Sequence, residues 1–155
     1  MMERRTLEIH WQRLVDAHGQ TCVRCAATGD AVRVAVERLG TALSPLGIDV
    51  VQVTEALDAS TFHANPLDSN RISIAGKSLE SWLGARSGQS RCCSACGGTD
   101  CRTLEVDGEI FEAVPAELII RAGLHAAADM LGAEPDAICC GPATKSGSVP
   151  PCCGS

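Results

Sequence analysis

Aromatic residues and positive charge are both scarce in this sequence. Its 155 residues include two tryptophans, two phenylalanines and no tyrosine, and the formal net charge is −6. Proteins that bind nucleic acids neutralise phosphates with basic residues and stack bases on aromatic rings. We therefore expect no nucleic-acid partner for this chain.

Long apolar runs are missing as well. No window of 18 or more apolar residues exists, which predicts no membrane span. Residues 1–15 mix polar and apolar side chains and lack the continuous apolar core of a secretory signal. We expect a cytoplasmic protein without membrane attachment, in a compartment where thiols are mostly reduced.

Cysteine, by contrast, is abundant. A chain of this length buries roughly 70% of its unfolded surface and needs no crosslinks to be stable, yet it has ten cysteines, and none of them is isolated. In a reducing compartment, clustered cysteines indicate metal or redox chemistry rather than structural disulfides. The three groups, all of them candidate metal ligands, are Cys22 and Cys25; Cys92, Cys93, Cys96 and Cys101; and Cys139, Cys140, Cys152 and Cys153.

Hydrophobic periodicity predicts alternating strands and helices. Residues 7–15 have the period-two pattern of a half-buried strand. The next helix either covers residues 30–43 with Asp30 as its N-cap, or begins at Thr21 and includes Gly29. The other expected elements are a strand of parallel-sheet character over 48–53, a strand over 71–75, a helical turn at 79–83, a cysteine-containing loop over 84–100, a hairpin over 103–111 and a helix over 115–131.

The order of these elements predicts an α/β domain. The first strand, helix and second strand form a right-handed βαβ unit. A Cys-x-x-Cys pair between a first strand and its helix is typical of the thioredoxin-like fold. We therefore expect a mixed sheet flanked by helices over residues 1–132, with a cysteine-rich loop. The Gly, Pro, Ser and Cys composition of residues 133–155 predicts a flexible tail.

The Cys22-Val-Arg-Cys25 pair leaves two chemistries open. If a helix begins here, its N-terminal dipole and Arg24 lower the pKa of Cys22, and His18 adds positive charge. In a redox enzyme, Cys22 is the attacking thiolate and Cys25 resolves the mixed disulfide. In a metal site, both are ligands. Whether the protein is an enzyme is open at this point.

The second group has the pattern of a metal knuckle. In Cys93-Ser-Ala-Cys96-Gly-Gly the glycines allow a tight turn around the sulfurs, and Cys101 is close enough to be a third ligand. Cys92 is adjacent to Cys93, and neighbouring residues only awkwardly bind one tetrahedral ion. Three thiolates with an open fourth position suit Hg(II), Cu(I), As(III) or Sb(III), although a structural zinc ion is a possible occupant.

The third group is two adjacent-cysteine pairs, Cys139-Cys140 and Cys152-Cys153, joined by a linker of Gly, Pro and Ser. A linker of this kind spans roughly 20 Å, so the pairs can meet each other or reach the other groups. Paired thiols on a mobile arm suit the capture and hand-over of a thiophilic ion.

Five segments carry a family resemblance: Leu7-Glu-Ile-His-Trp-Gln-Arg-Leu, Thr21-Cys-Val-Arg-Cys25, Ser69-Asn-Arg-Ile-Ser-Ile, Leu79-Glu-Ser-Trp-Leu83 and Val114-Pro-Ala-Glu-Leu-Ile. Together they resemble a bacterial thioredoxin-like family of unknown function. The resemblance covers about residues 6–130 and implies the thioredoxin-like fold. The two tail pairs are similar to those of the arsenic metallochaperones, which bind trivalent arsenic or antimony and deliver it to an efflux ATPase.

Three functions follow as hypotheses. The first is a binding protein or chaperone for soft metal or metalloid ions in arsenic or mercury resistance, with an efflux pump or a thiol reductant as its partner. The second is a thiol–disulfide oxidoreductase that uses Cys22 and Cys25. Such enzymes usually have a cis-proline before the strand opposite the pair, and Pro66 is the only candidate here. The third is a structural-zinc domain for protein contacts.

Overall fold

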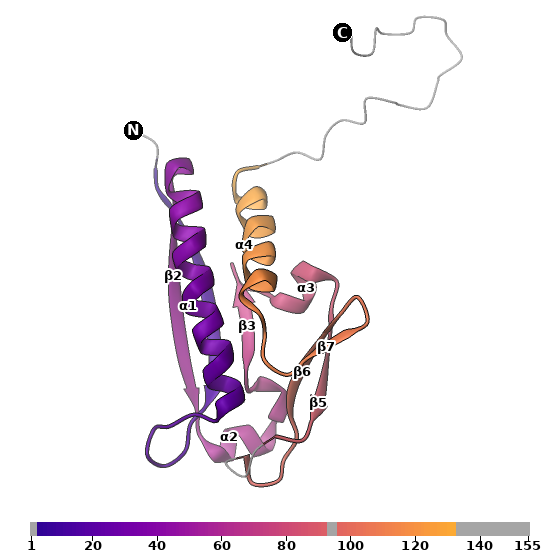
Figure 1. The fold of residues 1–155 in the computed structure, drawn as a ribbon. Helices are drawn as coiled ribbons and strands as arrows, with labels where there is room; N and C mark the ends of the chain where they lie inside the picture. The colour runs from indigo at the N-terminus through magenta and orange to yellow at the C-terminus, as the bar shows by residue number, and fades with distance from the viewer. Residues whose placement is uncertain (1–2, 93–95, 133–155) are drawn as a thin grey trace, which may run out of the picture.

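The computed structural model describes residues 3–92 and 96–132. Cys93 and the expected flexible tail, residues 133–155, lie outside the described residues. The chain forms two sheets, of which the larger has four strands and the smaller three (Figure 1). In sheet order, the larger contains β2 (Ile48–Leu57), β1 (Arg5–Leu14), β3 (Arg71–Ile74) and β4 (Lys77–Ser78), and the smaller contains β5 (Arg86–Ser90), β6 (Cys101–Val106) and β7 (Glu109–Phe111).

The larger sheet has the predicted mixed topology of a thioredoxin-like fold. β1 and β2 are parallel and are connected by a long helix, whereas β3 and β4 are antiparallel to their neighbours. No helix within the described residues is long and apolar enough to cross a membrane. The helices are α1 (Val23–Leu43), α2 (Ala59–Ala64), α3 (Leu79–Leu83) and α4 (Ala116–Met130), with 3-10 turns at Ser44–Leu46 and Pro66–Asp68.

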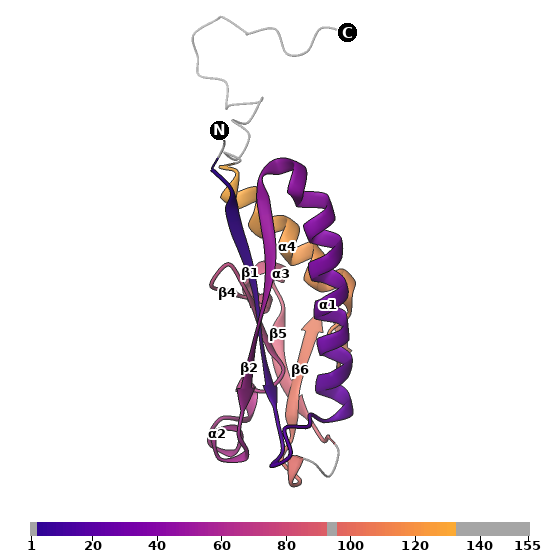
Figure 2. The same cartoon turned by 90° about the vertical axis from the view of Figure 1, so that its left-hand side faces the viewer.

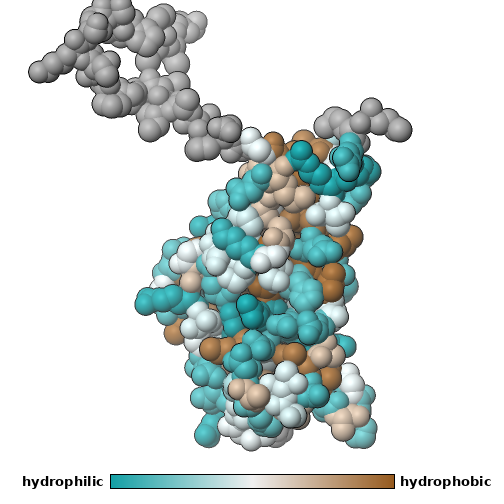
Figure 3. Space-filling model, turned by 180° about the vertical axis from the view of Figure 1, so that it is seen from behind, coloured by the Kyte–Doolittle hydropathy of each residue, from teal (hydrophilic) through white to brown (hydrophobic). Residues whose placement is uncertain are grey.

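α1 and α4 pack side by side on one face of the larger sheet (Figure 2). On β1, Leu7, Ile9 and Trp11 point into this interface and are buried, which confirms the period-two prediction for this strand. The opposite face is open, and polar and apolar side chains are mixed on it (Figure 3). β2 is therefore parallel as predicted but is not buried on both faces, and its Val51 is 38% exposed.

The start of α1 follows the second of the two sequence alternatives. Cys22 is the N-cap and the helix runs through Gly29, so the prediction of Asp30 as N-cap is wrong. Asp30 instead forms an ion pair with Arg33 within the helix. Glycine is required at position 29 because a Cβ there would lie 2.4 Å from the Trp11 ring. Helix and strand can approach closely only where this side chain is missing.

The sequence predicts only part of the smaller sheet. The hairpin of β6 and β7 turns at Asp107 and Gly108, both with positive φ, as the Asp-Gly signal predicts. The sequence predicts a loop where β5 lies, because Arg-Ser-Gly-Gln-Ser shows no apolar alternation. It is a strand because its backbone pairs with β6. Pro115, the predicted first helical residue, is instead the N-cap of α4, so the helix begins one residue later, at Ala116.

A buried hydrogen-bond network joins α1 to both sheets. The Thr28 hydroxyl accepts from the Asn70 amide at 2.9 Å and from the Val114 backbone N–H at 3.1 Å. The Asn70 side-chain oxygen accepts from the Trp11 indole at 3.2 Å. Asn70 precedes β3, and Val114 follows β7. Buried polar groups must be paired, so this network fixes the relative position of the helix and the two sheets.

Gly29→Ala is expected to lower the free energy of unfolding by about 1–3 kcal/mol, because the new methyl group meets a Trp11 ring that is buried and hydrogen-bonded. Gly40→Ala is the matched control on the same helix. Nothing lies within 4 Å of its added Cβ, so the better helix propensity of alanine should stabilise the protein by about 0.5–1 kcal/mol. Urea unfolding followed by circular dichroism measures both, and equal effects would contradict the packing argument.

Candidate metal centre

The tertiary structure brings cysteines from two separate groups together. Cys22 caps α1 and Cys25 lies in its first turn. Cys92 follows the end of β5, and Cys101 is the first residue of β6. Because Ser90 pairs with Cys101 across the hairpin, the connection that carries Cys96 lies at the same end of the molecule as the start of α1.

Three sulfurs converge at this end. The Sγ atoms of Cys22, Cys92 and Cys96 all lie within 4.8 Å of one another, and those of Cys22 and Cys92 are 3.9 Å apart. We call these three residues the thiol triad. Four sulfurs around a tetrahedral ion with bonds of about 2.3 Å would be about 3.8 Å apart. The triad is therefore already near the spacing that a shared ion needs.

Two further thiols lie directly behind the triad. The Sγ atoms of Cys101 and Cys96 are 3.0 Å apart, and the Cys25 backbone N–H donates to the Cys22 sulfur at 3.5 Å. Cys25 and Cys101 are each only 1% exposed. Cys22, Cys25, Cys96 and Cys101 are free thiols. We call the triad together with Cys25 and Cys101 the thiol cluster.

The environment holds protons on most of this cluster. The hydrogen bond with Cys25 and burial raise the pKa of Cys22 to about 12. Burial, with the hydrogen bond that Cys96 shares with Cys101, also raises the pKa of Cys96, and burial raises that of Cys101 to about 12. The pKa of Cys25 is lowered, because the Cys22 thiol hydrogen-bonds to it. Close packing of thiols thus disfavours more than one thiolate until a cation neutralises them.

The prediction that Cys22 has a lowered pKa is therefore wrong. Its sulfur does accept the Cys25 backbone N–H, as an N-cap should, but the neighbouring thiol and burial outweigh that effect. Arg24 does not act as the predicted thiolate partner, since its guanidinium donates to Ser90 and Arg91. His18 lies in an exposed turn, where its backbone N–H donates to Asp16.

The glycine turn after Cys96 agrees with the knuckle prediction. Gly97 and Gly98 both have positive φ, and the Thr99 N–H donates to the Cys96 carbonyl at 3.0 Å. His63 of α2 lies beside this turn and shares a hydrogen bond of 3.1 Å with the Thr99 hydroxyl. No sequence signal links His63 to the turn, because the contact spans 36 residues.

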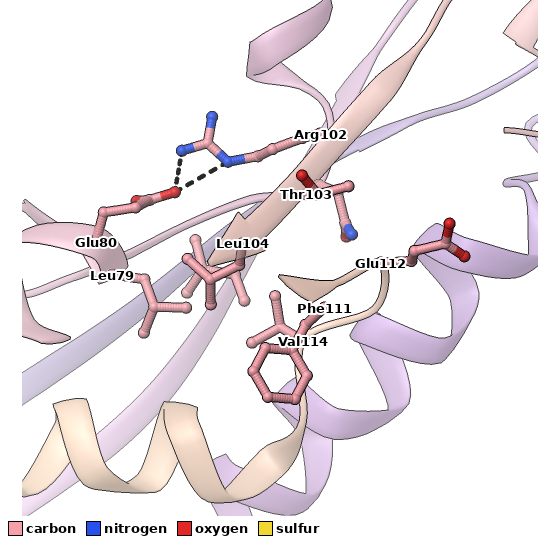
Figure 4. A pocket seen from close by; sticks show the side chains of 10 residues that line it. Leu79, Glu80, Arg102, Thr103, Leu104, Phe111, Glu112 and Val114 are labelled. Atoms are coloured by element: carbon pink, nitrogen blue, oxygen red, sulfur yellow. Dashed lines mark hydrogen bonds and ion pairs between the residues drawn. The ribbon is translucent and has the colours of Figure 1, made fainter. Parts of the chain in front are cut away.

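A largely buried ion pair anchors the start of β6. Arg102, next to Cys101, donates through Nε to the Glu80 carboxylate of α3 at 3.1 Å, and both side chains are less than 15% exposed (Figure 4). Arg102 also donates to the Leu67 carbonyl. The pocket beside this pair has room for about one water molecule. The ion pair therefore holds the cysteine-bearing strand β6 against α3.

The proline expected opposite the cysteine pair does not occupy that position. Pro66 lies in a 3-10 turn, and every peptide bond of the described residues is trans. The residue directly before β3 is Asn70, which is part of the buried network with Thr28. The structure therefore does not supply the cis-proline that the oxidoreductase hypothesis would use.

Comparison with known proteins gives a family match. The model of a family described as a domain of unknown function (DUF2703) matches residues 7–123. A protein of Archaeoglobus fulgidus, named as an uncharacterized protein, is 42% identical over 113 residues, which is 73% of this chain and 82% of that protein. No solved structure matches. The matched residues 7–123 include the whole thiol cluster and end before the tail cysteines.

Ion binding to the triad is expected to release protons. Cys22 and Cys96 have raised pKa values, so both are protonated in the free protein near neutral pH and must lose their protons to bind an ion. Release of at least these two protons per ion makes the affinity rise by about 100-fold or more per pH unit between pH 6 and 8. Calorimetric titration with Cd²⁺ in buffers of different ionisation enthalpy counts these protons.

The measurement uses a variant of the 155-residue chain in which four cysteines of the tail are replaced by serine: Cys139, Cys140, Cys152 and Cys153. We call this variant the tail-serine protein. Cys96→Ser in this background is the matched control, and the number of released protons should fall by one. Binding that is independent of pH would contradict the protonation state inferred for the cluster.

Proposed function

We propose that this chain, which belongs to the family described as a domain of unknown function (DUF2703), binds a soft metal or metalloid ion through the thiol triad. The observation that carries the proposal is the convergence of three sulfurs, of Cys22, Cys92 and Cys96, within 4.8 Å. As(III), Sb(III) and Hg(II) are the ions that fit best.

The donor set supports soft ions. Among the described residues, the atoms that meet at this position are all sulfur, without a carboxylate or imidazole in the group. Thiolates select soft or borderline cations and bind hard ions such as Mg²⁺ and Ca²⁺ poorly. Three sulfurs on one side of an ion also suit the three bonds of trivalent arsenic or antimony, which place a lone pair on the other side.

Burial favours binding over disulfide exchange. A catalytic thiol must be both ionised and accessible to the disulfide that it attacks. Cys22 is 6% exposed with a pKa raised to about 12, and Cys25, whose pKa is lowered, is 1% exposed. A small ion can enter such a site through the triad, whereas a protein disulfide cannot reach Cys25 directly.

The proposed role is capture and transfer of the ion in the cytoplasm. The tail pairs Cys139-Cys140 and Cys152-Cys153 would take up the ion and exchange it with the triad, with an efflux pump or a thiol reductant as the acceptor. This part of the proposal is supported by the sequence of the tail.

A structural zinc ion is the second candidate. The 3.9 Å separation of the Cys22 and Cys92 sulfurs agrees with a tetrahedral zinc site. The Cys101 sulfur lies 3.0 Å from that of Cys96 and outside the group of three, so it would have to shift to become the fourth ligand. Zinc therefore requires Cys101 as well as the triad, whereas a three-coordinate metalloid does not.

Arsenite titration of the reduced tail-serine protein is expected to show one ion bound with sub-micromolar affinity. Cys22→Ser, Cys92→Ser and Cys96→Ser should each weaken binding by more than 10-fold, because each removes one of three arsenic–sulfur bonds. Cys25→Ser is the matched control within the cluster and should retain binding. Calorimetry gives the affinity, and X-ray absorption should count three sulfurs per arsenic.

Cys101→Ser separates the two candidates. It should leave arsenite binding nearly unchanged if the site is three-coordinate, and it should strongly weaken Zn²⁺ binding if zinc is the resident ion. Stoichiometric zinc in protein purified without added metal, together with no arsenite binding, would overturn the metalloid proposal. Restoring the four tail cysteines should strengthen arsenite binding by the full chain.

A further inference from the structure

Arg24 is charged and almost fully buried beside the thiol cluster. Its side chain is 8% exposed, although it lies in the first turn of α1 between Cys22 and Cys25. Nη1 donates to the Ser90 hydroxyl at 3.1 Å and to the Ser90 carbonyl at 3.4 Å. Nη2 donates to the Arg91 carbonyl at 2.9 Å.

These hydrogen bonds connect the two segments that supply the triad. Ser90 ends β5, and the Arg91 carbonyl belongs to the same planar peptide unit as the Cys92 nitrogen. A guanidinium that donates to this carbonyl therefore restrains the peptide plane from which Cys92 extends. The backbone of Arg24 lies in the helical turn that begins with Cys22. Arg24 thus connects the backbone that carries Cys22 to the backbone that carries Cys92.

The charge of Arg24 is largely compensated. Nη2 is 3.0 Å from a carboxylate oxygen of Glu112, which points toward α1 (Figure 4). The Ser90 hydroxyl also donates to Glu112 at 3.3 Å. Because a carboxylate faces the guanidinium at this distance, the net field of the pair at the sulfurs is small. Position, rather than charge, is then what Arg24 contributes.

We infer that Arg24 is a positioning residue of the ion site, which holds Cys92 in register with Cys22. The inference rests on the proposed function, since it assigns Arg24 a role in ion binding by the triad. Residues that orient metal ligands typically change affinity about 10- to 100-fold when they are removed. Arg24→Ala is expected to weaken arsenite binding by that factor.

Two further variants test whether Arg24 acts through its charge or through the hydrogen bonds that position Cys92. Arg24→Lys keeps the positive charge but cannot donate to two carbonyls with a rigid fork, so it should weaken arsenite binding nearly as much as Arg24→Ala. Glu112→Gln removes the compensating charge and leaves the hydrogen bonds of Arg24 to Ser90 and Arg91 available. It should leave affinity within a few-fold of the parent. Arsenite affinity that is restored in Arg24→Lys, or that increases greatly in Glu112→Gln, would show that the charge of Arg24 determines the affinity.

Arg33→Ala is the matched control for loss of an arginine from α1. Arg33 is 71% exposed and pairs with Asp30 on the same helix, so its removal should leave arsenite affinity unchanged. All variants are measured in the reduced tail-serine protein. X-ray absorption on the arsenite-loaded forms is expected to count three sulfurs in the Arg33 variant and fewer than three in the Arg24 variants. A loss of stability alone would not change that number.

The outcomes distinguish the two proposals. If the parent protein binds arsenite through three sulfurs and Arg24→Ala does the same with equal affinity, the positioning role is overturned and the proposed function stands. If the parent protein does not bind soft ions, both proposals fail. Should Arg24→Ala not fold, the Arg24→Lys variant decides by the same sulfur count.

A second readout needs no ion. The alkylation rate of Cys92 by iodoacetamide, mapped by mass spectrometry, should rise in Arg24→Ala relative to Arg33→Ala, because the segment that carries Cys92 is no longer held against α1. Equal rates in the two variants would contradict the restraint on which the positioning role depends.

Discussion

The close contact of α1 with β1 at Gly29 and Trp11 is the constraint on which the rest of the structure depends. It sets the height and angle of the helix over the larger sheet, and so determines where the first turn, with Cys22, emerges. One residue earlier on the same helix, Thr28 accepts hydrogen bonds from Asn70 and Val114 and fixes both sheets to that helix. The position of the ion site is therefore decided in the core, several residues away from any sulfur.

The thiol cluster is an unfavourable arrangement that a cation would relieve. Several thiols share one buried space, and their pKa values are raised because neither burial nor a neighbouring thiol favours a second negative charge. A bound cation reverses this relation, since it stabilises each thiolate that contacts it. Arg24 and Arg102, which are adjacent in sequence to Cys25 and Cys101, do not provide that stabilisation. One holds backbone carbonyls and Glu112, and the other is paired with Glu80.

The larger sheet and its helices follow a thioredoxin-like plan, but the smaller sheet changes what the cysteine pair can do. β5, β6 and their connection bring Cys92, Cys96 and Cys101 against the start of α1, where an oxidoreductase would need open access to its attacking sulfur. The pair thus becomes part of a larger buried cluster. In this chain the helix start that resembles a redox site is part of a group of three cysteines that could hold a metal ion.

Local pattern determined much of the fold. The sequence alone predicts the alternation along β1, the Asp107-Gly108 turn, the βαβ order and the groups of cysteines. Each of these features depends on residues that are close together in the chain. The sequence does not predict β5, because this segment is a strand through its pairing with β6 and not through its own side chains. The union of Cys22 with Cys92 and Cys96, and the placement of Arg24 on Ser90 and Arg91, were decided only by the tertiary structure. These contacts join residues about 70 positions apart, and sequence spacing carries no information about distances created by packing.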